Sequence, residues 1–252
     1  MSAKARALLE VQDISISFGG LHALRNVSFR LEPGLIVGVM GPNGAGKTTL
    51  FNLISGVYRA SAGRISLDGV DLQNLSPSQI SRAGVARTFQ SGRPFTNLTA
   101  RENIMVGLFY GAGRTRDRRA AKREADRILE FVGLERQAER PVLSLNLVER
   151  KIVELGRAIA TRPKLLMLDE LLAGLNPNDL EPAIKAICRV RDELDITVVW
   201  IEHIMQVLMK TCEHLIVLHH GEMLTEGSPA DVAADPVVSN AYFGSKGASR
   251  VA

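Results

Sequence analysis

A glycine-rich segment carries the clearest chemical signal in the sequence. Residues 41–49 read GPNGAGKTT and match the pattern G-x-x-x-x-G-K-[ST]. Small residues let successive backbone N–H groups turn towards a phosphate, and a following helix directs its positive end at the same anion. Lys47 can then reach the β- and γ-phosphates, and the Thr48 hydroxyl can ligate Mg²⁺. The residues predicted to bind ATP or GTP are Gly41, Pro42, Asn43, Gly44, Ala45, Gly46, Lys47, Thr48 and Thr49.

An acidic pair follows a second apolar run. Residues 165–170 read LLMLDE, which places Asp169 at the carboxyl end of a predicted buried strand. Ligands of open α/β sheets gather at this edge. One carboxylate there can hold Mg²⁺, and the adjacent Glu170 can act as general base for an attacking water. Together with the glycine-rich segment, the pair predicts nucleotide hydrolysis.

Predicted strands and helices alternate around both segments. Alternating or continuous apolar runs predict strands at residues 9–18, 27–31, 35–40, 64–67, 165–169, 197–201 and 214–218. Helical stretches are expected at residues 47–55, 179–193 and 203–210. The alternation predicts an α/β core with a mainly parallel sheet and an antiparallel β edge, formed by residues 1–90 and 161–225.

The middle of the chain has a different character. Helical spacing dominates residues 91–160, with helices expected at 100–109, 115–132 and 148–160. In the second of these, Ala120, Ile128 and Phe131 are expected to form an apolar stripe. The pattern predicts a helical subdomain inserted into one nucleotide-binding domain of residues 1–252, with a tail of turns and short helices at 226–252.

The composition is that of an ordinary globular protein. The 252 residues are 46% hydrophobic and 23% charged, which excludes a disordered or fibrous chain. The net charge of +4 is too small to indicate nucleic-acid binding. No apolar run approaches the ~18 residues of a membrane span, and the N-terminus lacks the apolar core of ~7–15 residues of a signal peptide. We therefore expect a soluble, cytoplasmic protein.

Five motifs in this order resemble the nucleotide-binding subunit of ATP-binding-cassette (ABC) transporters. They are GPNGAGKTT, ARTFQ with Gln90, LLMLDE, AGLN at residues 173–176 and IEH with His203, and the resemblance covers nearly the whole chain. More narrowly, FGGLHAL, ENIMVGL, AGLNP and AYFG resemble the ATPase of bacterial importers for branched-chain amino acids, urea or amides. The resemblance implies an ATP-hydrolysing importer subunit with ATP and Mg²⁺ as cofactors.

The resemblance also implies roles for individual residues. Phe18 stands where an aromatic ring stacks on adenine, and the alternative is a core residue at a strand end. Gln90 corresponds to a residue that senses Mg²⁺ and the membrane partner, and His203 to one that contacts the γ-phosphate. The implied catalytic residues are Lys47, Glu170 and His203, and the implied metal site comprises Thr48, Gln90 and Asp169.

Partners and location follow from the same resemblance. It implies a second ATPase subunit in a homo- or heterodimer, transmembrane permease subunits, an indirect solute-binding protein and no nucleic acid. The chain would lie peripherally at the cytoplasmic face of the inner membrane. Three alternatives stay open: an ABC ATPase of DNA repair or translation, a phosphotransferase and a regulatory, weakly hydrolysing subunit. The first usually carries a coiled-coil insertion or second cassette, and the second lacks the motifs around Gln90 and His203.

One motif departs from the family. In ABC ATPases, the phosphate loop of one subunit faces a signature segment, L-S-G-G-Q, of the other subunit. An alignment without gaps places this segment here at Leu145, Asn146, Leu147, Val148 and Glu149. An alternative alignment through Leu143 and Ser144 needs an extra residue in the following helix. Asn146 is a good helix N-cap, whereas Val148 adds a β-branched side chain where backbone approaches phosphate. We expect a weakened contribution to the partner's ATP, or a substitution tolerated without loss; Leu171, in place of proline, is a milder change.

A basic run lies between the predicted helices of the middle region. Residues 114–124 contain six cations, Arg114, Arg116, Arg118, Arg119, Lys122 and Arg123, against Asp117 and Glu124. Attraction to anionic lipids or to an acidic partner is one interpretation. A solvated helix start is favoured, because acids are interspersed and aromatic residues are absent.

Overall fold

The structure, a computed structural model, describes residues 7–89 and 94–243. Contacts divide the chain into two units. The first contains the described residues up to Pro77 and from Val199 onward, and the second contains residues 78–198. The predicted division into a core and a helical subdomain at 91–160 does not coincide with these units and stays a prediction.

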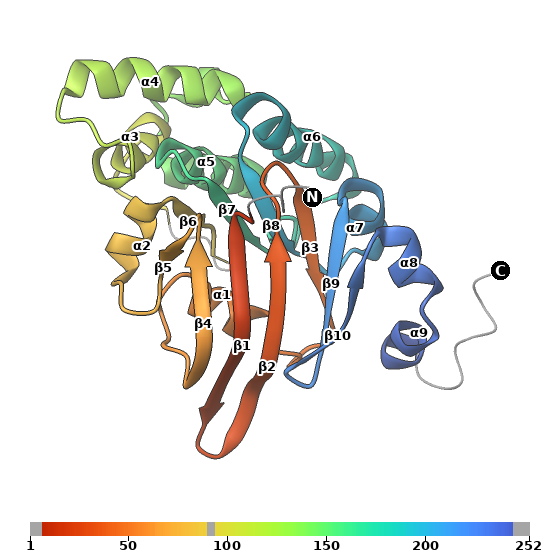
Figure 1. Ribbon diagram of the computed structural model, residues 1–252. Helices are drawn as coiled ribbons and strands as arrows, with labels where there is room; N and C mark the ends of the chain where they lie inside the picture. Colours follow the sequence, from red (N-terminus) through yellow and green to blue (C-terminus); the bar gives the residue numbers. More distant parts are fainter. Residues whose placement is uncertain (1–6, 90–93, 244–252) are drawn as a thin grey trace, which may run out of the picture. The chain divides into compact units, whose positions relative to one another are not determined.

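The first unit contains an antiparallel sheet with the strand order β2-β1-β4-β5 (Figure 1). Its strands are β1 (Leu9–Phe18), β2 (Leu21–Leu31), β4 (Ala62–Leu67) and β5 (Val70–Asp71). Gly19 and Gly20 connect β1 to β2 with positive φ angles of 53° and 85°, as a two-residue hairpin turn requires. Val11 and Ile14 are both buried, although residues three positions apart in a regular strand point to opposite faces. A β-bulge between them shifts the register and brings both side chains to the buried face.

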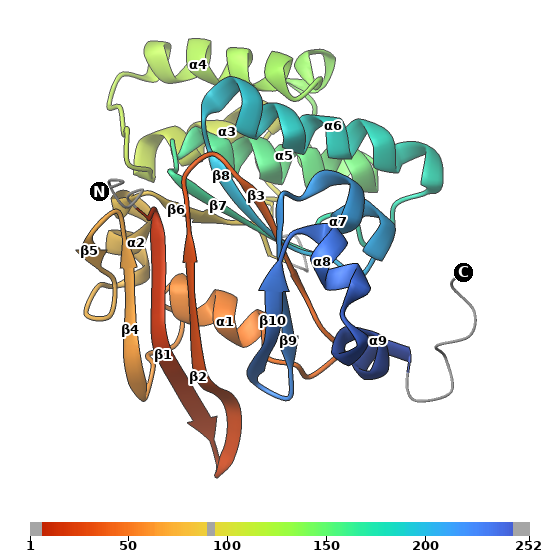
Figure 2. The same cartoon turned by 45° about the vertical axis from the view of Figure 1, so that its right-hand side comes forward.

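A parallel pair of strands leads to the glycine-rich segment. β3 (Ile36–Met40) pairs in parallel with β9 (His214–His219), and β9 pairs with the antiparallel β10 (Glu222–Gly227). All five residues of β3 are buried, as its continuous apolar sequence predicts. α1 (Lys47–Ile54) follows the segment and contacts β2 (Figure 2). The remaining elements are β8 (Thr197–Ile201), which spans the unit boundary, α7 (Met205–Thr211), α8 (Pro229–Ala234) and α9 (Pro236–Phe243).

The second unit combines a parallel strand pair with packed helices. Its elements are α2 (Pro77–Ala83), β6 (Val85–Arg87), α3 (Ala100–Tyr110), α4 (Arg118–Phe131), the 3₁₀ turns Glu135–Gln137 and Val142–Ser144, α5 (Leu147–Ala160), β7 (Leu165–Asp169) and α6 (Pro177–Leu194). β6 and β7 pair in parallel from Val85↔Leu165 to Arg87↔Met167. α3 packs on α4 and α5, and it approaches α5 so closely that a Cβ on Gly107 would lie 2.4 Å from the Arg157 carbonyl oxygen.

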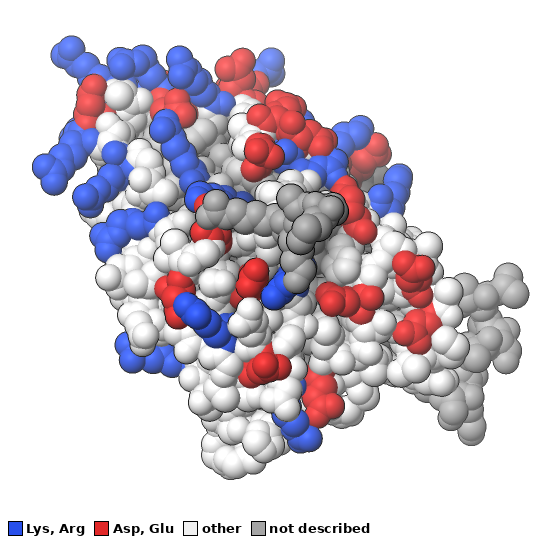
Figure 3. Space-filling model, viewed as in Figure 1, with Lys and Arg blue, Asp and Glu red and all other residues white. Residues whose placement is uncertain are grey.

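The buried face of α4 differs from the predicted apolar stripe. Ile128 is buried, but Ala120 and Phe131 are only half-buried. The buried residues of α4 are Ala121, Ala125, Ile128 and Leu129. The packing of α3 and α5 selects this face, which lies about one residue around the helix from the predicted one. The cations of the basic run are exposed, and Lys and Arg side chains gather over α4 (Figure 3).

Among the described residues, no helix is both long enough and apolar enough to cross a membrane.

Candidate functional site

The glycine-rich segment forms a tight loop between β3 and α1. Gly41, Gly44 and Gly46 have positive φ angles of 152°, 81° and 103°, which glycine adopts without strain. A Cβ on Gly41 would lie 2.2 Å from the Leu218 carbonyl oxygen, and one on Gly46 would lie 2.5 Å from Leu24 Cδ2. Both the backbone conformation and the space therefore demand glycine at the first and last of these positions.

The β9–β10 turn braces this loop from behind. Gly221 N donates to the Ala45 carbonyl at 3.1 Å, and Arg25 N of β2 donates to the Gly221 carbonyl at 2.8 Å. Arg25 also forms an ion pair with Glu222 at 3.1 Å. The turn thus links β2 to the loop through backbone hydrogen bonds. Sequence reasoning missed this support, because the two segments lie almost 180 positions apart in the chain.

Lys47 places its ammonium group inside the loop. The side chain is buried, and Nζ donates to the carbonyl oxygens of Gly41 at 2.7 Å and Pro42 at 3.1 Å. Gly46, the N-cap of α1, provides no side-chain cap, so the first amides of the helix are not bonded by a capping side chain. Thr48 is exposed in the first turn. A cation, the start of a helix and an accessible hydroxyl in one tight turn fit a phosphate group.

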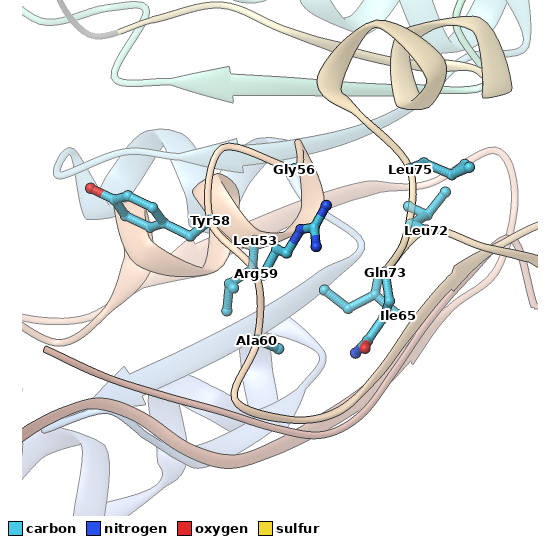
Figure 4. A pocket seen from close by; sticks show the side chains of 9 residues that line it. All are labelled: Leu53, Gly56, Tyr58, Arg59, Ala60, Ile65, Leu72, Gln73 and Leu75. Atoms are coloured by element: carbon cyan, nitrogen blue, oxygen red, sulfur yellow. The ribbon is translucent and has the colours of Figure 1, made fainter.

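Phe18 lies at the exposed end of β1. Its side chain is 45% exposed and meets Tyr58 edge-on, with ring centroids 5.1 Å apart. This exposure excludes the alternative of a buried core residue, and stacking on adenine stays a prediction. Tyr58 also lines a small pocket of about 20 Å³, which holds no more than one water molecule. Figure 4 shows the Tyr58 ring directed away from the other residues that line this pocket. Tyr58 is a second candidate that sequence reasoning missed.

His203 follows β8 and is exposed in the first unit. The preceding Glu202 is buried and accepts a hydrogen bond from Trp200 Nε1 at 3.2 Å, which fixes the chain just before the histidine. The other predicted contact to nucleotide and metal, Gln90, lies outside the described residues.

Asp169 ends β7 as a buried carboxylate. One oxygen, Oδ2, forms an ion pair with Arg87 Nη2 at 2.7 Å, and both side chains are at most 5% exposed. Asp169 N donates to the Thr88 hydroxyl at 3.2 Å. Within residues 7–89 and 94–243, the buried Oδ1 has no hydrogen-bond partner. An anionic oxygen with open acceptor capacity fits Mg²⁺. Arg87 was missed, although it stands three residues before Gln90 in the ARTFQ motif.

Glu170 directly follows Asp169 in an uncommon backbone conformation. Its φ angle is 50°, in the left-handed region that residues other than glycine rarely adopt. The half-exposed side chain is followed by Leu171 and Leu172, which are 4% and 1% exposed. Ala173 N donates to the Glu170 carbonyl at 3.1 Å and closes the turn. Leu171, which replaces the family's proline, thus contributes a buried anchor to this turn.

The predicted signature segment forms the start of α5. Asn146 is the N-cap, as expected: its side chain accepts from Glu149 N at 2.9 Å, while the Glu149 carboxylate accepts from Asn146 N at 2.9 Å. α5 begins at Leu147, within the five residues that the alignment without gaps assigns to the signature segment. Glu149 also accepts from Gln137 Nε2 at 3.1 Å. The Asn146 and Glu149 side chains therefore already accept hydrogen bonds from backbone N–H groups at the start of α5, and the Glu149 side chain is anionic.

The structure distributes the predicted residues over the two units. Phe18, the phosphate loop and His203 belong to the first unit. Asp169, Glu170 and the signature segment belong to the second. Each group is assembled locally, by a strand end and the turn or helix that follows it.

Known proteins with similar sequences are transport ATP-binding proteins. The ABC transporter family model matches residues 24–173. The chain is 38% identical to the high-affinity branched-chain amino acid transport ATP-binding protein BraF of Pseudomonas aeruginosa, over 95% of this chain and 99% of that protein. The corresponding protein LivG of Escherichia coli K12 is also 38% identical, with the same coverage.

Solved structures with similar folds are ATP-binding cassettes. A nucleotide-free cassette from an ABC transporter has a TM-score of 0.85 and 30% identity, over 94% of this chain and 99% of that one. A cassette in its ADP conformation has a TM-score of 0.84 and 31% identity, with the same coverage. These similarities confirm the predicted fold class.

Proposed function

The chain belongs to the ABC transporter family, and we propose that it is the ATP-hydrolysing subunit of a bacterial importer for branched-chain amino acids or related amides. The observation that carries the proposal is the loop at residues 41–49, in which Lys47 and three left-handed glycines form a phosphate cradle. The similarity to BraF and LivG over 95% of the chain supports the choice of solute class.

The proposed chemistry assigns a task to each group. Lys47 and the loop amides bind the phosphates of ATP. Thr48, Asp169 and Gln90 would hold Mg²⁺, which supplies positive charge to the phosphate oxygens. Glu170 orients a water and accepts its proton as the water oxygen attacks the γ-phosphorus; the bond to the bridging oxygen of ADP then breaks. His203 contacts the γ-phosphate.

Transport is driven by a difference in ATP affinity between the closed and the open pair of ATPase subunits. Two ATPase subunits close around two ATP molecules, because contacts to the γ-phosphate favour the closed pair. Hydrolysis removes those contacts and the pair reopens. In this proposal the subunits are bound to permease subunits at the cytoplasmic face of the inner membrane, and a solute-binding protein delivers the solute.

The decisive experiment uses the importer assembled with its permease and second ATPase in sealed vesicles. In Glu170→Gln, ATP should still bind and hold a closed dimer, while phosphate release falls about 10²- to 10⁴-fold because the proton acceptor is lost. Glu181→Gln, at an exposed glutamate on α6, is the matched control and should behave as wild type. Full activity of Glu170→Gln would exclude Glu170 as the base. No ATP-dependent uptake of labelled leucine or short amides by the wild-type complex would refute the importer proposal.

We also propose that the signature segment contributes weakly to the ATP of the partner subunit. Two observations favour this: Val148 places a β-branched side chain at the start of α5, and the Glu149 carboxylate bonds Asn146 N at the same helix end. An anionic side chain there opposes the approach of a γ-phosphate. In a heterodimer whose partner has an intact signature, hydrolysis would then occur mainly at the site of Lys47 and Glu170.

A further inference from the structure

Lys151 connects the helix of the signature segment to the turn that follows Glu170. It lies in the second turn of α5, and its Nζ donates to the carbonyl oxygens of Leu171 at 2.8 Å and Ala173 at 2.7 Å. Backbone carbonyls bonded by an ammonium group receive charge-assisted hydrogen bonds, which are stronger than bonds between neutral groups. One side chain thus fixes two successive parts of the turn behind the proposed catalytic base.

The conformation of this turn has to be maintained by its surroundings. Glu170 has a φ of 50°, and such a conformation persists in a residue other than glycine only where neighbouring structure holds it. Leu171 and Leu172 anchor the turn on its buried side, whereas Ala173 and Gly174 are exposed. The two hydrogen bonds from Lys151 reach the turn on either side of the buried Leu172, so they restrain its exposed part.

The segment just before the same helix is also held by a side chain of α5. Arg150, the residue before Lys151, donates to the carbonyl oxygens of Leu145 at 2.8 Å and Leu143 at 2.7 Å. The Leu147 side chain lies next to Gly174, where an added Cβ would be 3.5 Å from Leu147 Cδ2. Adjacent cations on α5 therefore bond the segment before the helix and the turn after Glu170. A helix transmits a displacement along its axis, so a shift of its start changes both sets of bonds.

We propose that Lys151 is a positioning residue that couples the signature end of α5 to the orientation of Glu170 in the same chain. Contact between α5 and the ATP of the partner subunit would, through Lys151, set the base that acts on this chain's own ATP. The inference rests on the proposed function, in which Glu170 activates water. It assigns Lys151 no contact with nucleotide.

The test compares steady-state hydrolysis by the assembled importer carrying Lys151→Met, Lys151→Arg or Lys185→Met. Lys151→Met should lower kcat about ten- to a hundredfold, because misplacing a reacting group by about 1 Å has effects of this size. KM for ATP should stay within about twofold of wild type. Lys151→Arg keeps a cationic donor and should recover part of kcat. Lys185 is paired with Glu181 on the exposed face of α6, so Lys185→Met should match wild type.

Each outcome decides the proposal. A wild-type kcat in Lys151→Met would overturn it. A loss of kcat that only matches the loss of folded protein, and that Lys151→Arg does not restore, would also overturn it. A double-mutant cycle with Val148→Gly tests the coupling: non-multiplicative effects on kcat support it, and multiplicative effects overturn it. A wild-type complex without ATPase activity would instead refute the proposed function.

Discussion

The ion pair between Arg87 and Asp169 gives the sharpest energetic prediction. Arg87→Met removes the cation but keeps an unbranched side chain of similar length, so that the change in packing is small. The Arg87 and Asp169 side chains are 5% and 2% exposed, with Nη2 and Oδ2 2.7 Å apart. In the variant, a buried carboxylate would lose the cation that compensates its charge.

The expected loss follows from this burial. Removing one partner of a buried pair lowers the free energy of unfolding by about 3–5 kcal/mol, because the remaining charge keeps its desolvation penalty. A domain has a net stability of about 5–15 kcal/mol, so the loss is a large fraction of the total. An exposed pair such as Lys185 with Glu181 contributes only about 0.3–0.5 kcal/mol.

Urea unfolding of the full chain measures this difference. Wild type, Arg87→Met, Asp169→Asn and the double variant form a cycle that separates the pair from the contact of Arg87 with the Phe89 ring at 5.0 Å. We expect a coupling energy of about 2–3 kcal/mol, and Lys185→Met as a control should unfold as wild type does. A loss below about 1 kcal/mol in Arg87→Met, or a coupling energy near zero, would refute the account of Asp169 as a carboxylate whose charge is balanced by Arg87.

Two further variants test the site. Phe18→Ala should weaken ATP binding by about 1–3 kcal/mol, the usual contribution of an aromatic ring stacked on a base, and should affect GTP similarly; unchanged affinity in a titration would exclude Phe18 from the base contact. Val148→Gly should raise the ATPase rate of the assembled importer, because it removes a β-branched side chain from the start of α5. An unchanged rate would argue that this substitution is tolerated and that the two ATP sites do not differ for this reason.

Much of the fold was predictable because its signals are local. The nearly continuous apolar run at residues 35–40 predicts β3, and the glycine spacing that follows predicts the loop, since each depends on residues next to one another in the chain. The long helices α3, α4, α5 and α6 of the second unit were likewise placed to within three residues at each end. The N-cap role of Asn146 follows from its own side chain.

The sequence alone therefore determined the phosphate-binding loop, the strand before it and the long helices, whereas β6, β10 and α2 were not predicted. Only the tertiary structure decided which face of α4 is buried, that Arg87 balances Asp169, that the Gly221 turn braces the loop and that Lys151 holds the turn after Glu170. The hydrogen bonds and the ion pair among these contacts join residues 20 to 196 positions apart, and their energies depend on burial and direction that no local pattern contains.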